Sequence, residues 1–336
     1  METLTASYVN AIGTPAVEGL IFRPFRRDTD YPSYLEMLNA AYLEDKIDAV
    51  ETIEGLRHED DHLTHCDLNM DTLVADIGGR VVGQARVSWW VNDVGERLYG
   101  IWGNVHPAWR GKGIGRALLH WQEQRARDIA AGHPNDHPRA LQAWTMNSAV
   151  SRARLLKRAG YEPVRYGFMM SRSLEEPIPD LPLPAGLDVR PVQPEHMRAI
   201  WDALDEAFRD HWGHRPGTEE DYQRFIGWPD QTPQLWQVAW AGDQVAGMVL
   251  NTIFERENIA LNQKRGWTDP ICVRRPWRKQ GLARALIMRS LRLLEEQGML
   301  EACLGVDTHN PNGALRLYET CGYRQINSST TYRKPL

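Results

Sequence analysis

The sequence predicts an α+β protein made of two similar domains, each with a mixed, mostly antiparallel central sheet flanked by helices. Three observations support this prediction. With 336 residues, the chain is about twice as long as a common single domain. Patterns in the first half recur in the second half in the same order. In both halves an apolar strand leads into a glycine-containing loop that opens a long amphipathic helix.

The internal repeat has a period of about 165 residues. Because the matches keep their order at a near-constant offset, they indicate a duplication and predict domains at residues 1–174 and 187–336. Residues 175–186 between them are rich in proline, which favours extended structure and predicts a linker or a strand-like segment pinned between the domains. The matching segments are 20–24 with 187–191, 72–83 with 237–247, 105–118 with 273–286, and 159–161 with 321–323.

Both copies predict the same order of elements. A short strand precedes helical stretches, and a hairpin follows whose turn contains glycine, which tolerates the positive φ of such turns. A strand, the glycine loop, a long helix, a second apolar strand and a last helix complete each copy. The ranges expected for the first helix, the loop-preceding strand and the second apolar strand are 31–43, 101–105 and 141–145 in copy one and 195–208, 270–273 and 302–306 in copy two.

Composition and charge exclude several classes of protein. A formal net charge of −5 leaves no basic excess to neutralise nucleic-acid phosphates. No apolar segment approaches the roughly 20 residues that cross a bilayer, and the N-terminus lacks a secretory pattern. The sparse cysteines predict reduced thiols. We therefore expect a cytoplasmic protein, a monomer or homodimer, without a nucleic-acid or membrane partner. The cysteines are Cys66, Cys272, Cys303 and Cys321.

The glycine loop predicts a phosphate site. Small residues at Gly113 and Gly115, and at Gly281 and Ala283, let the backbone approach a ligand, and the following helix aims its free N–H groups at the same place. Pyrophosphate is the natural occupant. The alternative is a turn that only connects strand to helix. The occurrence of the loop at the same place in both halves argues against this alternative. The element order is not βαβ, and no G-K-[ST] is present, which disfavours dinucleotide-binding and Walker loops.

This loop resembles motif A of the GCN5-related N-acetyltransferase (GNAT) superfamily, and the resemblance covers nearly the whole chain, once per half. In that family the loop amides hold the pyrophosphate of acetyl-CoA, and the preceding strand splays from its neighbour to accommodate the thioester. The resemblance implies acetyl-CoA as co-substrate. The implied contacts are Val105, Arg110, Gly111, Lys112, Gly113, Ile114, Gly115 and Arg116 in copy one, and Cys272, Val273, Arg278, Lys279, Gln280, Gly281, Leu282, Ala283 and Arg284 in copy two.

The last helix distinguishes the two copies. Copy two resembles the family's final motif, which implies that Tyr318 protonates the leaving thiolate and that Asn310 or Asn312 holds the pantetheine arm. Copy one has Leu156 where copy two has Tyr318, and leucine donates no proton. We therefore predict catalysis in the second domain and a non-catalytic first domain that keeps its CoA loop. The alternative for Tyr318 is an ordinary half-buried helix residue.

The acceptor amine needs a base, because an ammonium group cannot attack a thioester. We select Asp269, just before the splayed strand, and we expect His211 and His214 to contact the acceptor, because this family binds it in that region. Main-chain N–H groups of the splayed strand would stabilise the oxyanion, and no acyl-enzyme is required. Alternatives for the base are a water chain, the two histidines, Glu255, Glu257 and Asp307.

A histidine cluster in the first domain raises the question of a metal. His58, His62 and His65 could share one helical face and bind zinc together with Cys66, but the sequence around them is typical of a solvated acidic helix. We predict no metal. Cys272 could suggest a covalent intermediate, but a lone thiol on an apolar strand is better explained by packing.

The predicted function is transfer of acetyl from acetyl-CoA to a primary amine of a small molecule by direct attack. One alternative is a non-catalytic acyl-CoA-binding or sensing protein. Others are peptide N-terminal or aminoglycoside acetylation, or a function like that of mycothiol synthases, which have a similar tandem layout and acetylate a cysteinyl amine. Acidic residues before the first hairpin and at 219–221 favour a cationic acceptor.

Overall fold

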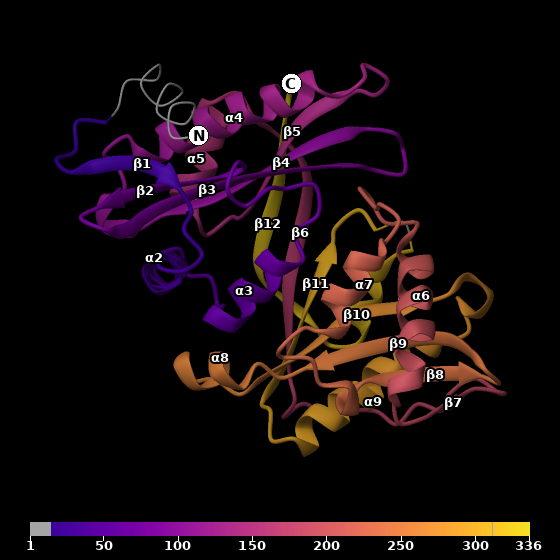
Figure 1. Ribbon diagram of the computed structural model, residues 1–336. Helices are drawn as coiled ribbons and strands as arrows, with labels where there is room; N and C mark the ends of the chain where they lie inside the picture. Colours follow the sequence, from indigo (N-terminus) through magenta and orange to yellow (C-terminus); the bar gives the residue numbers. More distant parts are fainter. Residues whose placement is uncertain (1–14, 311) are drawn as a thin grey trace. The chain divides into compact units, whose positions relative to one another are not determined.

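The computed structural model describes residues 15–310 and 312–336. The chain divides into two compact units. The N-terminal unit comprises Met1–Val164 with Thr330–Leu336, and the C-terminal unit comprises Arg165–Ser329 (Figure 1). The extreme C-terminal residues thus belong to the fold of the first unit, although the repeat had assigned them to the second.

The N-terminal unit is built on a mixed sheet in which β4 and β5 are parallel and the other described pairs are antiparallel. The β2–β3 hairpin turns at Gly78-Gly79, both with positive φ, as the sequence predicted. The strand order is β1 (Leu20–Pro24), β2 (Thr72–Ile77), β3 (Arg80–Val91), β4 (Arg97–Val105), β5 (Arg139–Met146) and then β12 (Arg324–Pro335).

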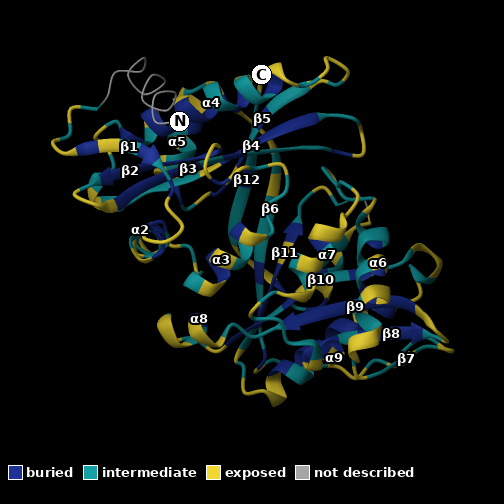
Figure 2. Cartoon of the chain, in the orientation of Figure 1, coloured by how far each residue is buried: buried dark blue, intermediate teal, exposed yellow. Residues whose placement is uncertain are grey.

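Helices cover both faces of this sheet, and each face has its own apolar core (Figure 2). Helices α2 (Tyr31–Glu44) and α3 (Ile53–Asp61) pack on one face through Met37, Leu38 and Leu56. Helices α4 (Ile114–Ala131) and α5 (Val150–Arg158) pack on the other through Leu118, Trp121 and Leu156. Apolar residues at helical spacing on α4 make this second core, which places the N-terminus of α4 at the end of β4.

The C-terminal unit repeats the design. Strands β10 and β11 are parallel, and the other described pairs are antiparallel. The strand order is β6 (Glu162–Ser173), β11 (Glu301–Asp307), β10 (Arg265–Val273), β9 (Gln244–Thr252), β8 (Gln237–Ala241) and β7 (Asp188–Val189). Its helices are α6 (Met197–Phe208), α7 (Glu219–Ile226), α8 (Glu255–Ala260), α9 (Leu282–Glu296) and α10 (Ala314–Thr320), and short 3-10 turns Pro107–Trp109 and Arg275–Trp277 precede the loops.

The predicted α+β class with two similar halves is confirmed, and the structure differs from the expected boundaries in two places. The long strands β6 and β12 were not expected, because they lack a long apolar run and most of their residues are exposed or half-buried. The proline-rich segment is not a free linker: Ile178, Leu181 and Leu183 pack on the core of the C-terminal unit. No helix in the described part of the chain is long and apolar enough to span a membrane.

Candidate active site in the gap between parallel strands

Both glycine loops have the same backbone conformation. In the N-terminal unit Gly111 and Gly113 have φ of 77° and 92°, and in the C-terminal unit Lys279 and Gly281 have φ of 62° and 86°. The helix starts at the next residue in each case, so successive main-chain N–H groups converge in front of its N-terminus. Lys279 adopts a conformation that ordinarily favours glycine, and such local strain concentrates at functional loops.

An arginine clamp holds each loop. Arg110 donates from Nε to the Val105 carbonyl (3.0 Å) and pairs with both oxygens of Asp45 at 2.6 and 2.8 Å. Arg278 donates from Nε to the Val273 carbonyl (2.9 Å) and from Nη1 to one oxygen of Asp210 (2.6 Å), while the other oxygen of Asp210 accepts from Arg275 (2.5 Å). Hydrogen bonds from Arg275 and Arg278 hold the pKa of Asp210 well below its usual range. The motif arginines therefore position the loop.

The other predicted loop residues fall into two groups. Ile114 and Leu282 are buried in the core, so only their main chain faces the loop. The Lys112 ammonium lies 4.3 Å from the centre of the Trp109 ring, and Gln280 donates to the Pro276 carbonyl (3.0 Å). A side chain at Gly115 would make ordinary contacts with Leu155 and Val105, which is consistent with alanine at position 283. Arg116 and Arg284 are both exposed and lie in the first turns of α4 and α9.

The parallel strands of each unit separate after a short paired stretch. β4 pairs with β5 only from Arg97↔Arg139 to Gly100↔Gln142. β10 pairs with β11 only from Arg265↔Glu301 to Trp267↔Cys303. Beyond these points, within the described part of the chain, no strand pairs with the edge of β4 that faces β5 or with the edge of β10 that faces β11, and both strands lead directly to the loop. This is the splayed strand pair that the family resemblance implied.

Asp269 lies in the gap of the C-terminal unit because of a β-bulge. The register of β10 against β9 shifts between Thr268 and Ile271, and such bulges re-aim side chains. Asp269 Oδ2 accepts a hydrogen bond from the Gly305 N–H of β11 (3.2 Å). Asp269 is exposed and lines a pocket of about 210 Å³, where the protein atoms of the pocket wall desolvate the carboxylate in part and raise its pKa to about 6. A carboxyl group with this pKa is suited to proton transfer near neutral pH.

Tyr318 approaches the same gap from α10. Its side chain is 7% exposed, and burial together with the nearby negative charge of Asp269 raises the pKa of the phenol above its usual value. The phenol therefore stays protonated, as a proton donor must. Its ring packs edge-on against Tyr323, with ring centres 6.2 Å apart. The gap thus has a carboxyl group, Asp269, and a protonated phenol, Tyr318, beside it.

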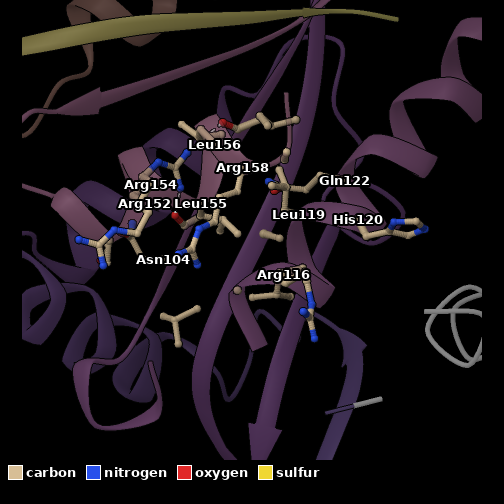
Figure 3. Close-up of a pocket in the computed structure, with 18 of the residues that line it drawn as sticks. Asn104, Arg116, Leu119, His120, Gln122, Arg152, Arg154, Leu155, Leu156 and Arg158 are labelled. Carbon is tan, nitrogen blue, oxygen red and sulfur yellow. Dashed lines mark hydrogen bonds between the residues drawn. The ribbon is translucent and has the colours of Figure 1, made fainter. Parts of the chain in front are cut away.

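The gap of the N-terminal unit lacks both groups. The repeat aligns Ile101 with Asp269 and Leu156 with Tyr318, and both are buried apolar residues of the core. β4 pairs with β3 without a register shift, so no bulge re-aims a side chain there. Figure 3 shows the large pocket of this unit, of about 740 Å³, whose labelled lining includes Arg116 of α4 and the α5 residues Arg152, Arg154 and Arg158.

The predicted acceptor histidines follow α6. His211 Nε2 lies 3.5 Å from Asn310 Nδ2, and burial lowers the pKa of His211. His214 lies 3.5 Å from Asp205. The Asn312 main-chain N–H donates to Asn310 Oδ1 (2.8 Å), so the two asparagines predicted to hold the pantetheine arm are hydrogen-bonded to each other beside His211. His211 therefore lies beside the predicted arm site, and it is not among the described residues that line the pocket at Asp269.

The alternative bases are mostly engaged elsewhere. Asp307 pairs with Arg165 at 2.6 Å, and Glu257 accepts from Gln263 at 3.4 Å. Cys272 is buried, and desolvation raises the pKa of its thiol to about 12, which fits a packing role. The sequence did not indicate the walls of the Asp269 pocket. They come from α7 and the strands around it, which local patterns cannot bring together, and include Phe225, Trp228, Trp236 and Leu250.

The histidine cluster of the N-terminal unit does not converge on one point. His58 and His62 lie with their rings 4.3 Å apart. His65 instead stacks on Trp89, with ring centres 4.0 Å apart and an interplanar angle of 11°. Among the described residues, no group of three or more histidine, cysteine or acidic side chains is arranged to hold a metal ion.

Comparison with known proteins agrees with this geometry. The acetyltransferase (GNAT) family model matches residues 197–323, and a GNAT domain model matches residues 69–163. The mycothiol acetyltransferase of Salinispora tropica is 32% identical over 68% of this chain and 71% of its own length. The chain belongs to the GNAT family. It is therefore an acyl-CoA-dependent N-acetyltransferase with two GNAT domains.

Further relatives match most of the chain. The mycothiol acetyltransferase of Parafrankia sp. is 27% identical over 79% of this chain and 84% of its own length. The structure of a GCN5-related N-acetyltransferase from Sphaerobacter thermophilus has a TM-score of 0.70 at 26% identity, covering 95% of this chain and 96% of that one. A tandem GNAT protein from the clavulanic acid biosynthesis pathway has the same fold, with a TM-score of 0.68 at 18% identity over 94% and 98% of the two chains.

Proposed function

We propose that the C-terminal unit transfers acetyl from acetyl-CoA to the primary amine of a small molecule, with Asp269 as base and Tyr318 as acid. The observation that carries the proposal is the gap between β10 and β11. It joins a carboxyl group whose pKa is about 6, a buried protonated phenol and the phosphate loop. The N-terminal unit has the loop but neither reacting group.

The loop of the C-terminal unit fits the phosphates of a CoA thioester. A Cβ added at Gly281 would meet nothing within 4 Å, so its left-handed backbone leaves the space in front of α9 open. The N–H groups of residues 279–283 would bind the pyrophosphate, aided by the helix dipole. The co-substrate supplies an acetyl thioester, and Asn310 or Asn312 would hold its arm.

The chain's own groups account for the proton movements. The Asp269 carboxylate takes a proton from the acceptor ammonium, and the freed nitrogen forms a bond to the thioester carbonyl carbon. Main-chain N–H groups of the unpaired β10 edge, near Cys272 and Val273, would stabilise the oxyanion. As the C–S bond breaks, Tyr318 donates its proton to the sulfur. Two protons then remain: the second proton on the new amide nitrogen and the proton held by Asp269. One of them returns to Tyr318, and the other is released to solvent.

The pocket at Asp269 supports a small acceptor. Its volume of about 210 Å³ is small for a ligand site, and aromatic and aliphatic side chains make much of its wall. The acidic group on this wall favours an ammonium-bearing substrate. Relatives named mycothiol acetyltransferases cover two thirds or more of this chain, which supports an acceptor of similar small-molecule type.

Release of CoA from acetyl-CoA in the presence of a panel of small primary amines tests the proposal. Tyr318→Phe should lower kcat by about 100-fold with little change in KM for acetyl-CoA, because general acid catalysis is typically worth 10²–10⁴-fold. Tyr161→Phe removes a buried phenol hydroxyl from the N-terminal unit and should leave kcat unchanged. Equal kcat values for wild type and Tyr318→Phe would refute the proposed acid.

A further inference from the structure

Helices α5 and α10 differ at the position that faces the gap between the parallel strands. The two helices align through their closing glycines, Gly160 and Gly322. In this alignment Arg152 of α5 corresponds to Ala314 of α10. The duplication therefore has a long cation in one unit and a methyl group in the other at an equivalent place.

The Arg152 side chain reaches from α5 to the unpaired edge of β4 (Figure 3). Its Nη2 donates to the Ile101 carbonyl at 3.2 Å, and its Nη1 donates to the Gly103 carbonyl. Both carbonyls lie just beyond Gly100, where the pairing of β4 with β5 ends. Arg152 thus binds the two main-chain carbonyl groups of β4 that do not pair with β5.

An unpaired strand edge is the kind of surface that binds an extended ligand containing amides, because alternating N–H and C=O groups are presented along it. The pantetheine arm of a CoA thioester is such a ligand. In the C-terminal unit Ala314 has only a methyl group at the equivalent position and leaves that edge accessible. In the N-terminal unit the arm would have to displace a guanidinium group from two carbonyl oxygens.

The opposite end of the N-terminal pocket retains features that bind anions. Gly111 and Gly113 form the left-handed loop in front of α4. Within the described part of the chain, Arg116, Arg154 and Arg158 line the pocket without a carboxylate partner. Uncompensated arginines next to a loop of free N–H groups favour a ligand with several phosphates.

We propose that the N-terminal unit binds the phosphorylated nucleotide end of CoA, and that Arg152 keeps the acyl-bearing arm out of the gap between β4 and β5. The ligand class is an adenosine nucleotide phosphorylated at both the 3′ and 5′ positions, either as part of CoA or free. This inference rests on the proposed function in so far as acetyl transfer is assigned to the C-terminal unit.

The test compares acetyl-CoA with adenosine 3′,5′-bisphosphate, which lacks the arm, by calorimetric titration of the full chain. A Gly281→Asp background places a charged side chain in the C-terminal loop, so that the N-terminal site alone is titrated. In this background the two ligands should bind with Kd values within about threefold of each other, because the arm adds no contacts. Arg152→Ala should tighten acetyl-CoA at least tenfold and leave the bisphosphate unchanged, which also shows that the pocket is folded.

Two further variants keep the outcome decisive. Arg152→Gln, a smaller change in packing, should give an intermediate gain for acetyl-CoA. The converse change, Ala314→Arg in an otherwise wild-type chain, should raise KM for acetyl-CoA at least tenfold. Preference for acetyl-CoA over the bisphosphate by more than tenfold with Arg152 present would overturn the proposal, as would no gain in Arg152→Ala. If the wild-type protein showed no turnover with any amine, the proposed function would be refuted. The proposal for the N-terminal unit would still stand or fall on the binding ratios, because they do not depend on catalysis.

Discussion

The two units share a fold and a phosphate loop, but they differ in what fills the gap beside the loop. In the C-terminal unit the gap contains Asp269 and Tyr318, whereas Ile101 and Leu156 stand at the aligned positions of the N-terminal unit. Arg152 closes the edge of β4 in the latter. Both units keep the residues that form the strand, the loop and the helix. The two groups suited to proton transfer occur only at the C-terminal positions of this alignment, Asp269 and Tyr318.

This difference separates structural from chemical requirements within one motif. The clamp formed by Arg110 and Asp45 has a counterpart in Arg278 and Asp210, and both link the loop to the first helix region of their unit. A charged, partly buried pair is costly to break because it leaves an unpaired charge behind. The clamp is therefore present in both units whether or not the proposed proton-transfer groups accompany it, and a phosphate loop alone does not identify a catalytic unit.

The largest expected effect comes from Asp269→Asn, which removes the proposed base. We expect kcat/KM for the amine to fall by about 10²–10³-fold, within the usual worth of general base catalysis. Because desolvation raises the pKa of Asp269 to about 6, wild-type activity should rise as the pH increases through about 6, where the carboxylate forms. The asparagine variant should lose this rise.

A pH profile of kcat/KM measures this effect, and Asp188→Asn, at a carboxylate paired with Arg190 on an edge strand, serves as control. Asp210 cannot cause the rise, because its arginine partners hold its pKa well below that range. A pH profile that keeps its rise near pH 6 in Asp269→Asn would mean that another group is the base. Asp269 would then no longer distinguish the C-terminal unit from the N-terminal unit.

A matched pair of loop variants sharpens the contrast. Gly281→Ala places a Cβ at a φ of 86°, which costs roughly 1–2 kcal/mol and crowds the phosphate site, so KM for acetyl-CoA should rise about tenfold. Gly113→Ala makes the same change at a φ of 92° in the N-terminal unit and should leave KM unchanged. KM for acetyl-CoA is measured in both variants by steady-state kinetics with saturating amine. Similar increases in both variants would mean that both loops serve turnover.

The smallest effect is expected from the clamps. Asp210→Asn weakens the charge-assisted bonds to Arg275 and Arg278, and a loss of about 1 kcal/mol in loop order should raise KM for acetyl-CoA several-fold. Asp45→Asn should lower the Tm of the protein without changing KM, because its loop belongs to the N-terminal unit. Thermal unfolding and kinetics of both variants test this division. A change in KM caused by Asp45→Asn would couple the two units.

The sequence predicted the features that local patterns carry. The hairpin turns, the apolar strands before the loops and the amphipathic helices appear where periodicity and glycine placed them. The final motif singled out Tyr318, and Asp269 was selected because it was expected just before the splayed strand; Asp269 instead lies within β10, and the roles of both residues stay predictions. The pocket walls Trp228 and Trp236 were not found, because they come from separate segments whose contacts no local pattern encodes. The strands β6 and β12 escaped prediction because half-exposed strands have no apolar run.

By itself, the sequence determined the duplication, the two phosphate loops and the inequality of Tyr318 and Leu156, since each is a matter of residue identity at aligned positions. Only the tertiary structure decided what those residues face. The bulge that turns Asp269 toward Gly305, the contact of Arg152 with the edge of β4 and the pairing of Arg278 with Asp210 all join segments far apart in the chain. Such contacts follow from how strands separate and helices pack, and local spacing does not specify either.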